Sequence, residues 1–597
     1  MKLIKHFDCM ELYMSLTLVT SYINFYRTPI VNHKPRIAQL QKLVDMEIPI
    51  LIFVSLDCTE ALEACLNPHE NVRMIPLAKS FFESSFVFLT AIQSSATKLP
   101  PHRLEPKDTF DYMCYQHSKV EFMYQAANRN PFNTKLFAWC DYDLMRHWKT
   151  YHTLQHIHTH GLPQLSHLPP TEHEPSKPIL PQDQVFFPGC WDAQKQPIQP
   201  YYCNHICWRF CGGFYLGTEA ALTKMHNLYL THFDTFLNTY ETMVWDVNFW
   251  AYLEQEKGWN PIVYKADHNP SLIENFPAFA FAHKLRTQNI IEHKYPDMGT
   301  FHPSSGSCVE WKGNIILNTR YVNYTYLPSG HCALAPDMKV CTQNMACYLK
   351  PDYTVDKKRD FSIVEMTEMG LPMPDPEEQY QGIEDIRLYT FQNKLKFVAT
   401  TVNYSGCANN RVIRGDYENI VGFRLKNVEI LQPPQPTPKE KNWIPLVPHD
   451  DPDQMYFVYG WNPFQLGVIK DSRLEITHLY DIHFPYRGPV RGSSNIVYDK
   501  ESRQYVALVH INEEYSLPKQ YFHMLIWLDE KTFQPTHYSK LFYFDVYGPE
   551  FCLSMKMTKY QYIFWISRYD QNPATMFVDR SLLDPVKYPI KIRSSNK

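Results

Sequence analysis

Apolar and polar residues alternate in two different ways along this chain. In the first half, short apolar runs at residues 16–22, 48–55 and 135–140 are rich in β-branched and aromatic residues, which predicts buried strands. Helical periodicity and one late apolar run predict helices at 37–46, 111–128, 217–238 and 242–257 and a strand at 262–264. Strands that alternate with helices indicate an α/β domain over residues 1–290.

From about residue 300 onward, helical periodicity almost disappears. Short strands alternate with turns in the segments 307–317, 385–402, 455–469, 494–511 and 563–578. Turn or strand-start signals at Gly382, Glu440, Arg491 and Gly548 recur at roughly the interval of a four-stranded propeller blade. With the segment around Trp311 as the first blade, the pattern predicts an all-β, five-bladed propeller over residues 291–597.

Composition and charge narrow the function classes. Of 597 residues, 44% are hydrophobic and 15% aromatic, which is enough for packed cores and excludes wholesale disorder. The 58 basic residues against 62 acidic ones give a net charge of −4, so we expect no nucleic-acid partner. The 15 cysteines lack regular spacing, no apolar run reaches about 18 residues, and the N-terminus lacks a signal-peptide pattern. We therefore expect an intracellular, cytoplasmic protein without a membrane span.

The sharpest local motif is Asp141-Tyr-Asp143, which directly follows the apolar strand at 135–140. The two carboxylates leave the sheet on the same side of the chain. They can hold a hard divalent cation, Mn²⁺ or Mg²⁺, that neutralises the diphosphate of a nucleotide sugar. A solvated strand end is the alternative interpretation, since Asp-x-Asp is common.

Five segments in order resemble the HtrL/YibB-like family of glycosyltransferases, which is assigned to the GT-A type of Rossmann-like α/β fold. They are residues 17–27, 49–55, 118–124, 130–141 and 211–217, and the resemblance covers roughly residues 14–270. The family's metal segment often has a single Asp followed by a small residue and Gly. The resemblance therefore supports Asp141 as a metal ligand more strongly than Asp143.

The resemblance also implies roles for residues outside this motif. It places Thr20, Tyr22 and Arg27 at the end of the first strand beside the nucleotide, and Lys119 beside the diphosphate. It makes Gly212 and Gly213 a point of close approach for a sugar, Asp246 the general base, and His268 a third metal or phosphate contact. The alternatives are a structural ion pair for Arg27, a solvated position for Lys119, a tight turn for the glycines and a helix-start acid for Asp246.

Two further clusters have simpler interpretations. Cys203, His205, Cys207 and Cys211 contain zinc-ligand types but lack paired C-x₂-C spacing, which favours buried thiols over a zinc site. The histidine-rich segment 147–173 is typical of a flexible loop on the acceptor side rather than of a metal site.

The second half resembles five-bladed, sugar-active propellers of the mannoside-phosphorylase and glycosidase type. Residues 382–387, Gly-Ile-Glu-Asp-Ile-Arg, are similar to the Glu-Asp-Pro-Arg segment of those propellers, with Ile386 in place of Pro. The resemblance implies a glycan-binding funnel lined by Arg320, Asn323, Glu384, Asp385, Arg387, Lys441, Arg491 and Glu550. An ion pair within the blade, between the acidic residues and Arg387, is the alternative.

Together these patterns predict a metal-dependent glycosyltransferase that moves a hexose from a nucleotide sugar to a glycan or glycoprotein acceptor. One alternative places the chemistry in the propeller, as a glycoside phosphorylase or hydrolase. Another is a non-enzymatic, glycan-binding protein.

Overall fold

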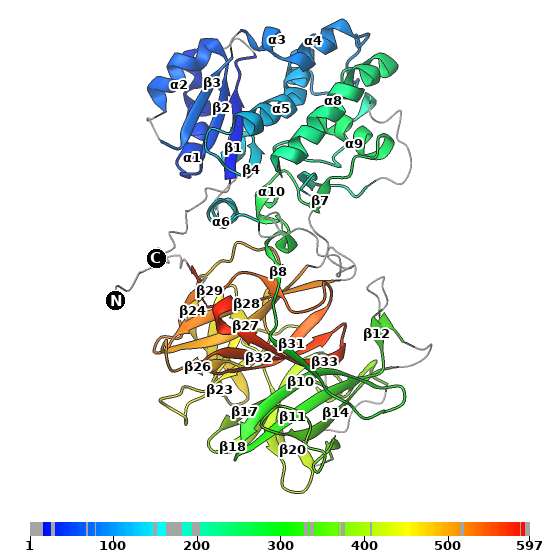
Figure 1. The fold of residues 1–597 in the computed structure, drawn as a ribbon, viewed down its shortest axis with the longest axis vertical. Coiled ribbons are helices and arrows are strands. Elements are labelled where there is room, and N and C mark those ends of the chain that lie inside the picture. The colour runs from blue at the N-terminus through cyan, green and yellow to red at the C-terminus, as the bar shows by residue number, and fades with distance from the viewer. Residues whose placement is uncertain are drawn as a thin grey trace, which may run out of the picture. The chain divides into compact units, whose positions relative to one another are not determined.

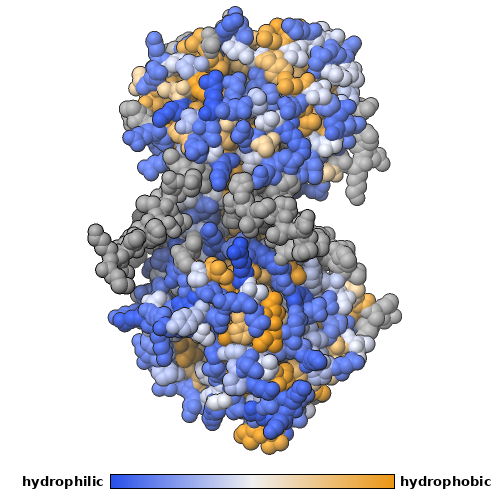
Figure 2. All heavy atoms as spheres, viewed as in Figure 1, coloured by the Kyte–Doolittle hydropathy of each residue, from blue (hydrophilic) through white to orange (hydrophobic). Residues whose placement is uncertain are grey.

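The chain forms two compact units that divide after Ala280, close to the predicted boundary at residue 290 (Figure 1). The computed structural model describes residues 16–25, 30–66, 70–77, 79–146, 152–162, 182–193, 203–326, 332–334, 339–367, 369–371, 377–405, 409–513, 519–584 and 587–590. Figure 2 shows mainly hydrophilic residues on the visible face of both units, so most apolar side chains of the strands and helices are turned inward.

The first unit is an α/β domain around a seven-stranded sheet of order β3-β2-β1-β4-β6-β5-β7. Its strands are β1 (Leu16–Tyr22), β2 (Ile50–Val54), β3 (Val72–Pro76), β4 (Leu136–Cys140), β5 (Phe186–Gly189), β6 (Phe214–Gly217) and β7 (Ile262–Lys265). Its α-helices are α1 (Lys34–Val44), α2 (Thr59–Cys65), α3 (Phe81–Ser84), α4 (Phe86–Gln93), α5 (Phe110–Arg129), α6 (His152–His160), α8 (Glu219–Tyr240), α9 (Asp246–Glu256) and α10 (Ser271–Glu274).

The strand order reverses direction at β1. The chain adds β2 and then β3 on one side of β1, and it returns to place β4 on the other side, with β1 parallel to both β2 and β4. Such a switch point leaves a crevice at the carboxyl ends of the two strands where the helices diverge. The next strand, β6, runs antiparallel to β4 and brings its preceding loop to the same end.

Alternate residues of the central strands pack into a core with the long helices. Val19 of β1, Phe53 of β2 and Trp139 of β4 share one hydrophobic cluster with Phe122 of α5 and Phe249 of α9. The strands are buried on both faces, which explains why they read as continuous apolar runs in the sequence.

The predicted elements of this unit are confirmed with small shifts at their ends. The predicted helix at 37–46 begins earlier, at Lys34, where Pro35 occupies the first turn, a position that tolerates proline. The four-residue strands β5 and β6 were not predicted, because an apolar run this short carries no clear periodicity.

The strands of the second unit group into five antiparallel blades among the described residues, and the outer strands of the first two blades pair in parallel, so these two blades share one nine-stranded sheet. Blades one and two are β10 (His302–Trp311), β11 (Asn314–Val322), β14 (Val340–Leu349) and β15 (Ser362–Glu365), then β17 (Ile383–Phe391), β18 (Lys394–Thr401), β19 (Arg411–Glu418) and β20 (Phe423–Leu431). Blade three is β21 (Ile444–Leu446), β22 (Tyr456–Trp461), β23 (Phe464–Lys470) and β24 (Arg473–Tyr480). Blade four is β25 (Val490–Gly492) with β26 (Val497–Asp499), β27 (Gln504–Glu513), β28 (Gln520–Asp529) and β29 (Pro535–Tyr538).

The fifth blade joins the two ends of the unit. It consists of β31 (Glu550–Met557), β32 (Gln561–Arg568) and β33 (Gln571–Asp579), and its outer strand β9 (Asn289–Glu292) comes from the start of the unit. Shorter strands are β8 (His283–Lys284), β12 (Thr325–Tyr326), β13 (Cys332–Ala333), β16 (Tyr380–Gln381), β30 (Phe542–Tyr543) and β34 (Tyr588–Pro589). Closure by β9 makes the unit a ring, since β10 of the first blade contacts β31 of the last.

The hydrophobic cores of this unit lie between consecutive blades. Ile316 of blade one clusters with Phe397 of blade two, and Val412 of blade two clusters with Phe457 of blade three. Separate clusters join blades four and five and blades five and one. Stability therefore depends on the ring being closed, because each blade buries its faces only against its neighbours.

Each strand-rich segment predicted in this half forms two neighbouring strands of one blade. Several of the connecting turns need positive φ, as at Gln392 and Asn393 between β17 and β18 and at Tyr569 and Asp570 between β32 and β33. Such turns match the right-handed twist of a hairpin. No helix in the described part of the chain is long and apolar enough to cross a bilayer.

Buried polar contacts near the centre tie three blades together. Arg387 of β17 is 2% exposed, and its guanidinium donates to the Ser493 carbonyl at 3.1 Å and to Asn442 Oδ1 at 3.0 Å. Glu550 of β31 is fully buried and accepts from the backbone N–H groups of Phe544, Asp545 and Val546. Arg387 thus links neighbouring blades, and Glu550 holds the backbone just before its own strand; that these two side chains line a glycan-binding funnel stays a prediction.

We expect Arg387→Met to lower the free energy of unfolding by about 1–3 kcal/mol, because the buried Ser493 carbonyl and Asn442 amide lose their donor. Urea denaturation of the full chain measures this. The control is Arg503→Met, which removes an exposed pair with Glu530 and should change stability little. Equal effects of the two substitutions would contradict a clamping role for Arg387.

Candidate active site at the strand switch point

A pocket of about 820 Å³ lies at the carboxyl ends of β1 and β4, at the switch point of the sheet. Its walls come from α1, the segment before α5, α5 itself, the loop after β4, the loop before β6 and the start of α9. A volume of this size suits a ligand of roughly nucleotide-sugar dimensions. The site is therefore built from segments far apart in sequence but brought to one edge of the sheet.

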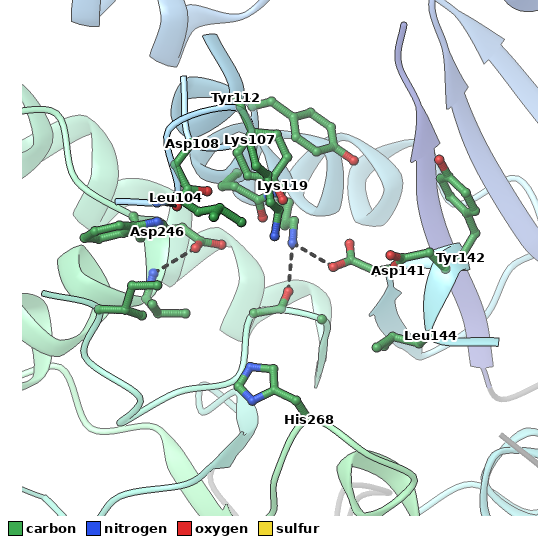
Figure 3. A pocket seen from close by; sticks show the side chains of 18 of the residues that line it. Leu104, Lys107, Asp108, Tyr112, Lys119, Asp141, Tyr142, Leu144, Asp246 and His268 are labelled. Carbon is green, nitrogen blue, oxygen red and sulfur yellow. Dashed lines mark hydrogen bonds and ion pairs between the residues drawn. The ribbon is translucent and has the colours of Figure 1, made fainter. Parts of the chain in front are cut away.

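A buried ion pair lies at the centre of the pocket (Figure 3). Lys119 of α5 is 1% exposed, and its Nζ donates to Asp141 Oδ2 at 3.0 Å and to the Gly212 carbonyl at 2.9 Å. The other oxygen of Asp141 accepts from Trp139 Nε1 at 2.8 Å. Lys119 therefore joins the end of β4 to the loop before β6, and its third N–H has no hydrogen-bond acceptor among the residues that the structure describes.

Burial sets the protonation behaviour of Asp141. It raises the pKa of this carboxyl to about 6, although the Lys119 ammonium acts in the opposite direction and Asp143 adds a smaller upward contribution. The carboxylate is thus ionised at neutral pH, and the positive charge of the Lys119 ammonium compensates its negative charge.

A second buried carboxylate, Asp246, begins α9 on the opposite wall. It is 4% exposed, and Oδ1 accepts from the Val247 N–H at 2.9 Å. Oδ2 has no hydrogen-bond partner among the described residues. Burial raises the pKa of Asp246, and Lys119 partly offsets the shift. An unpaired, buried carboxylate oxygen in a pocket has the character of a proton acceptor.

Close packing around the two predicted glycines leaves little room for a side chain. A Cβ on Gly212 would lie 3.1 Å from Asp246 Oδ2, and one on Gly213 would lie 3.0 Å from Leu144 Cδ1. Both residues line the pocket. A side chain at Gly212 would press on the unpaired oxygen of Asp246.

An arginine that the sequence analysis did not identify also lines the pocket. Arg36 of α1 donates from Nε to the Tyr142 hydroxyl at 2.8 Å, and its guanidinium lies over the Tyr22 ring, 5.1 Å from the centroid. The sequence offered one signal for Arg36: it directly follows Pro35, which marks the start of the first α-helix after β1. Phe25, Tyr112 and Tyr115 add an aromatic wall.

Several predicted nucleotide contacts are not at the pocket surface. Thr20 and Tyr22 are completely buried in β1, and the Tyr22 hydroxyl pairs with His33 Nδ1 at 3.0 Å. Neither side chain lines the pocket, because β1 is central and covered on both faces, so their contact with a nucleotide stays a prediction without support from this geometry. Arg27 lies outside the described residues.

The predicted metal ligands are distributed around the pocket rather than gathered. Asp143, in the 3-10 helix Tyr142–Arg146, pairs with Arg146 at 2.8 Å, and His268 lies beside Asp267 and Cys190. Asp143 and His268 both line the pocket with Asp141, but among the described residues the cluster suited to a metal contains only Cys190, Cys211 and His268.

The carboxylate oxygens at Asp141 nevertheless fit a hard cation whose remaining coordination positions would be filled by a bound ligand. Each oxygen of Asp141 accepts one hydrogen bond and keeps a lone pair, and Asp143 adds further carboxylate oxygens. Arg36, Lys107, Lys119 and Arg146 are balanced by Asp108, Asp141, Asp143 and Asp246 among the pocket residues. A diphosphate would thus meet no excess positive charge from these side chains, which favours a divalent ion as the missing countercharge.

The remaining cysteines of the predicted zinc-like cluster are separated. Cys207 is buried in the hydrophobic core, and the His205 ring stacks on His102 with centroids 4.3 Å apart. Histidines 152, 156, 158 and 160 form part of α6, whereas His147, His167 and His173 lie outside the described residues.

In the propeller, charged residues from several blades lie close to one another. Arg320 pairs with Asp385 at 3.1 Å and with Glu384 at 3.8 Å, and Arg491 donates to Asn512 Oδ1 at 3.3 Å. Arg320, Arg387 and Lys441 lower the pKa of Asp385 against its burial. The acidic residues therefore pair with a neighbouring blade instead of with Arg387. Asn323 holds the Lys339 carbonyl and the Cys341 N–H.

Comparison with protein-family models gives no match, and comparison with curated proteins gives none either. The expected resemblance to the HtrL/YibB-like family therefore has no support from these comparisons.

Some solved structures are similar to about half of the chain. A β-1,2-mannobiose phosphorylase from Listeria innocua has 11% identity and a TM-score of 0.33, covering 48% of this chain and 93% of its own. A glycosyl hydrolase from Bacteroides ovatus has 11% identity and a TM-score of 0.34, covering 52% and 96%. A GDP-Man-dependent mannosyltransferase from Leishmania mexicana has 11% identity and a TM-score of 0.33, covering 49% and 91%. TM-scores this low carry no argument about function, which must come from the geometry of this chain.

We expect Lys119→Met and Asp141→Asn each to lower the free energy of unfolding by about 1–3 kcal/mol, since Met leaves the acceptors of Lys119 without a donor and Asn removes the charge that compensates the buried ammonium. The double variant should lose less than the sum, because the interaction can be lost only once. A double-mutant cycle in urea measures the coupling. Lys98→Met is the control, because its pair with Glu241 is exposed and should matter little. Additive effects at positions 119 and 141 would contradict a coupled pair.

Proposed function

We propose that the protein is a carbohydrate-active enzyme whose α/β unit transfers a hexose from a nucleotide sugar to a glycan or glycoprotein acceptor. The observation that carries this proposal is the arrangement of the Lys119–Asp141 pair and the unpaired Asp246 carboxylate around one pocket at the switch point of the sheet. Sugar transfer needs a cationic group at the departing diphosphate and a base for the incoming hydroxyl. The pocket provides both.

Asp246 acts as the base in this proposal. Its Oδ2 removes the proton from the acceptor hydroxyl as that oxygen attacks the anomeric carbon and the bond to the diphosphate breaks. Burial makes the carboxylate a stronger base than it is in water, because the charged form loses solvation. The Val247 N–H holds Oδ1, so the carboxylate keeps Oδ2 directed away from the helix start.

Lys119 and Asp141 act on the diphosphate side. The third N–H of Lys119 donates to a phosphate oxygen, and the ammonium favours the negative charge that develops on the leaving group. Asp141, with Asp143, would hold Mn²⁺ or Mg²⁺, which when bound supplies positive charge to the diphosphate. The aromatic wall of Phe25, Tyr112 and Tyr115 covers apolar faces of the base or sugar.

Three variants separate donor binding from transfer. A nucleotide sugar present at 100 times its dissociation constant should stabilise the wild type by about 2.7 kcal/mol in a thermal-shift measurement with Mn²⁺. Asp141→Asn should abolish this stabilisation. Asp246→Asn should keep that stabilisation and lose transfer. Asp183→Asn, whose exposed carboxylate pairs with Lys224 on the surface, is the control and should behave as wild type. A wild-type chain that binds no nucleotide sugar in a full panel would refute the proposal.

The pH dependence of kcat/KM tests the base. Because burial raises the pKa of Asp246, activity should fall on acidification at a pH above the ordinary range of an aspartate. Lys119 lowers this pKa, so Lys119→Met should move the acidic limb to higher pH in whatever activity remains. A limb near pH 4, the unperturbed value of about 3.9, would show that a solvated carboxylate controls the rate.

A second candidate, glycoside phosphorolysis or hydrolysis in the propeller, is favoured by one observation. Asp385 has a φ of 54° at a register shift of β17, so the strand bulges where this carboxylate meets Arg320. Non-glycine residues in this region of φ are strained, and bulges re-aim side chains at sites. Glu384 lies next to it, so two carboxylates face the same arginine.

This candidate predicts sugar release from disaccharides, with a sugar phosphate as product when inorganic phosphate is present. Asp385→Asn should abolish the release. Asp416→Asn, on β19 of the same blade and paired with Lys396, is the control. Absence of release by the wild type, or release that Asp385→Asn leaves unchanged, would rule the propeller out as the catalytic unit.

A further inference from the structure

Three segments that are distant in sequence bring metal-binding side chains together beside the pocket. Cys190 directly follows β5, Cys211 precedes β6, and His268 follows β7. The Sγ atoms of the two cysteines lie 3.5 Å apart, and Cys190 Sγ lies 3.9 Å from His268 Nδ1. All three ligand atoms lie within 4.8 Å of one another.

Asp267 adds a fourth donor at the same place. Its Oδ1 lies 3.5 Å from Cys190 Sγ and 3.5 Å from His268 Nδ1. A tetrahedral zinc with bonds of about 2.3 Å to sulfur and about 2.0–2.2 Å to nitrogen or oxygen separates its ligand atoms by roughly 3.5–3.8 Å. The four separations given above are close to these edges. The three ligand atoms of Cys190, Cys211 and His268 lie within 4.8 Å of one another and Asp267 lies outside that group, so binding requires the Asp267 carboxylate to move toward Cys211.

The backbone around the cluster is fixed by the sheet. Strands β5 and β7 pair in parallel as far as Gly189 and Lys265, and the Cys211 N–H donates to the Pro188 carbonyl at 2.8 Å. The N–H groups of Cys190 and Trp191 both donate to the Trp208 carbonyl, and the Trp208 ring packs edge-on against His268. The ligands are thus held by secondary structure rather than by one mobile loop.

We propose that Cys190, Cys211, His268 and Asp267 bind one zinc ion. Two thiolates, one imidazole nitrogen and one carboxylate oxygen make a donor set typical of zinc. Binding releases the two thiol protons to solvent, and His268 binds through Nδ1 with its proton on Nε2. Cys211 is buried whereas His268 is exposed, so the ion enters from the His268 side.

The site has a direct structural consequence for the pocket. Cys211 is followed by Gly212, whose carbonyl holds Lys119, and His268 itself lines the pocket. Zinc would therefore fasten the loop that carries Gly212 and Gly213 to the ends of β5 and β7. This assignment does not depend on the reaction proposed for the pocket.

Zinc content of the full chain tests the proposal. The protein is expressed without a metal-affinity tag, equilibrated with zinc and dialysed, and we expect one zinc per chain by elemental analysis. Cys190→Ser and Cys211→Ser should each abolish retention, and Asp267→Asn should weaken affinity at least about tenfold in a competitive chelator titration. Cobalt in place of zinc should give thiolate-to-metal absorption with tetrahedral d–d bands.

Two controls distinguish this site from its rivals. Cys203→Ser changes a nearby cysteine outside the cluster and should keep the zinc, whereas a site built from residues 203, 205, 207 and 211 would lose it. Thiol titration of the denatured, non-reduced chain should find all 15 cysteines as thiols.

Three results would overturn the assignment. They are a wild-type chain that retains no zinc, a cobalt spectrum without thiolate absorption, and a titration that finds two thiols fewer because Cys190 and Cys211 form a disulfide. The cobalt spectrum and the titration use the wild type, so they decide the matter even if a cysteine variant fails to fold.

Discussion

The ion pair between Lys119 and Asp141 is the interaction on which the candidate active site depends. It is formed where β4 leaves the sheet and where α5 crosses the switch point, and the Gly212 carbonyl shares the same ammonium. An unpaired lysine at this depth would be costly, so the pair, the strand end and the glycine loop must form together. The position of Asp246 follows from it, because Gly212 is the residue that approaches its free oxygen.

The loop before β6 is therefore held from two directions. Lys119 of α5 donates a hydrogen bond to the Gly212 carbonyl of this loop, and the Cys211 N–H at the start of the loop donates to the Pro188 carbonyl of β5. A binding loop that must approach a ligand closely cannot rely on its own side chains, since two successive glycines have none. Its rigidity has to come from neighbours, which explains why charged and thiol groups gather around Gly212 and Gly213.

In the propeller, buried polar side chains also hold backbone segments that apolar packing does not fix. Its apolar cores lie between blades, so the centre of the ring, where strands converge, is held by side chains such as Arg387 that bond to carbonyls of the next blades. Closure by β9 ties the last blade to the start of the unit. Arg320 and Asp385 form a further contact of this kind, an ion pair between blades one and two.

Local pattern was sufficient to predict the α/β unit, the all-β unit, the boundary between them and the number of blades, because periodicity and turn chemistry act over a few residues. The roles of Lys119, Gly212, Gly213 and Asp246 were implied only by the family resemblance, whereas local pattern singled out Asp141, which follows a strand. Local pattern failed where long-range packing decides. Thr20 and Tyr22 are buried because β1 became central, and Arg36 reaches the pocket through the placement of α1. Cysteines spaced at 190, 203, 207 and 211 gave no sign that Cys190 and Cys211 would meet His268, because only the pairing of β5, β6 and β7 brings those three strand ends together.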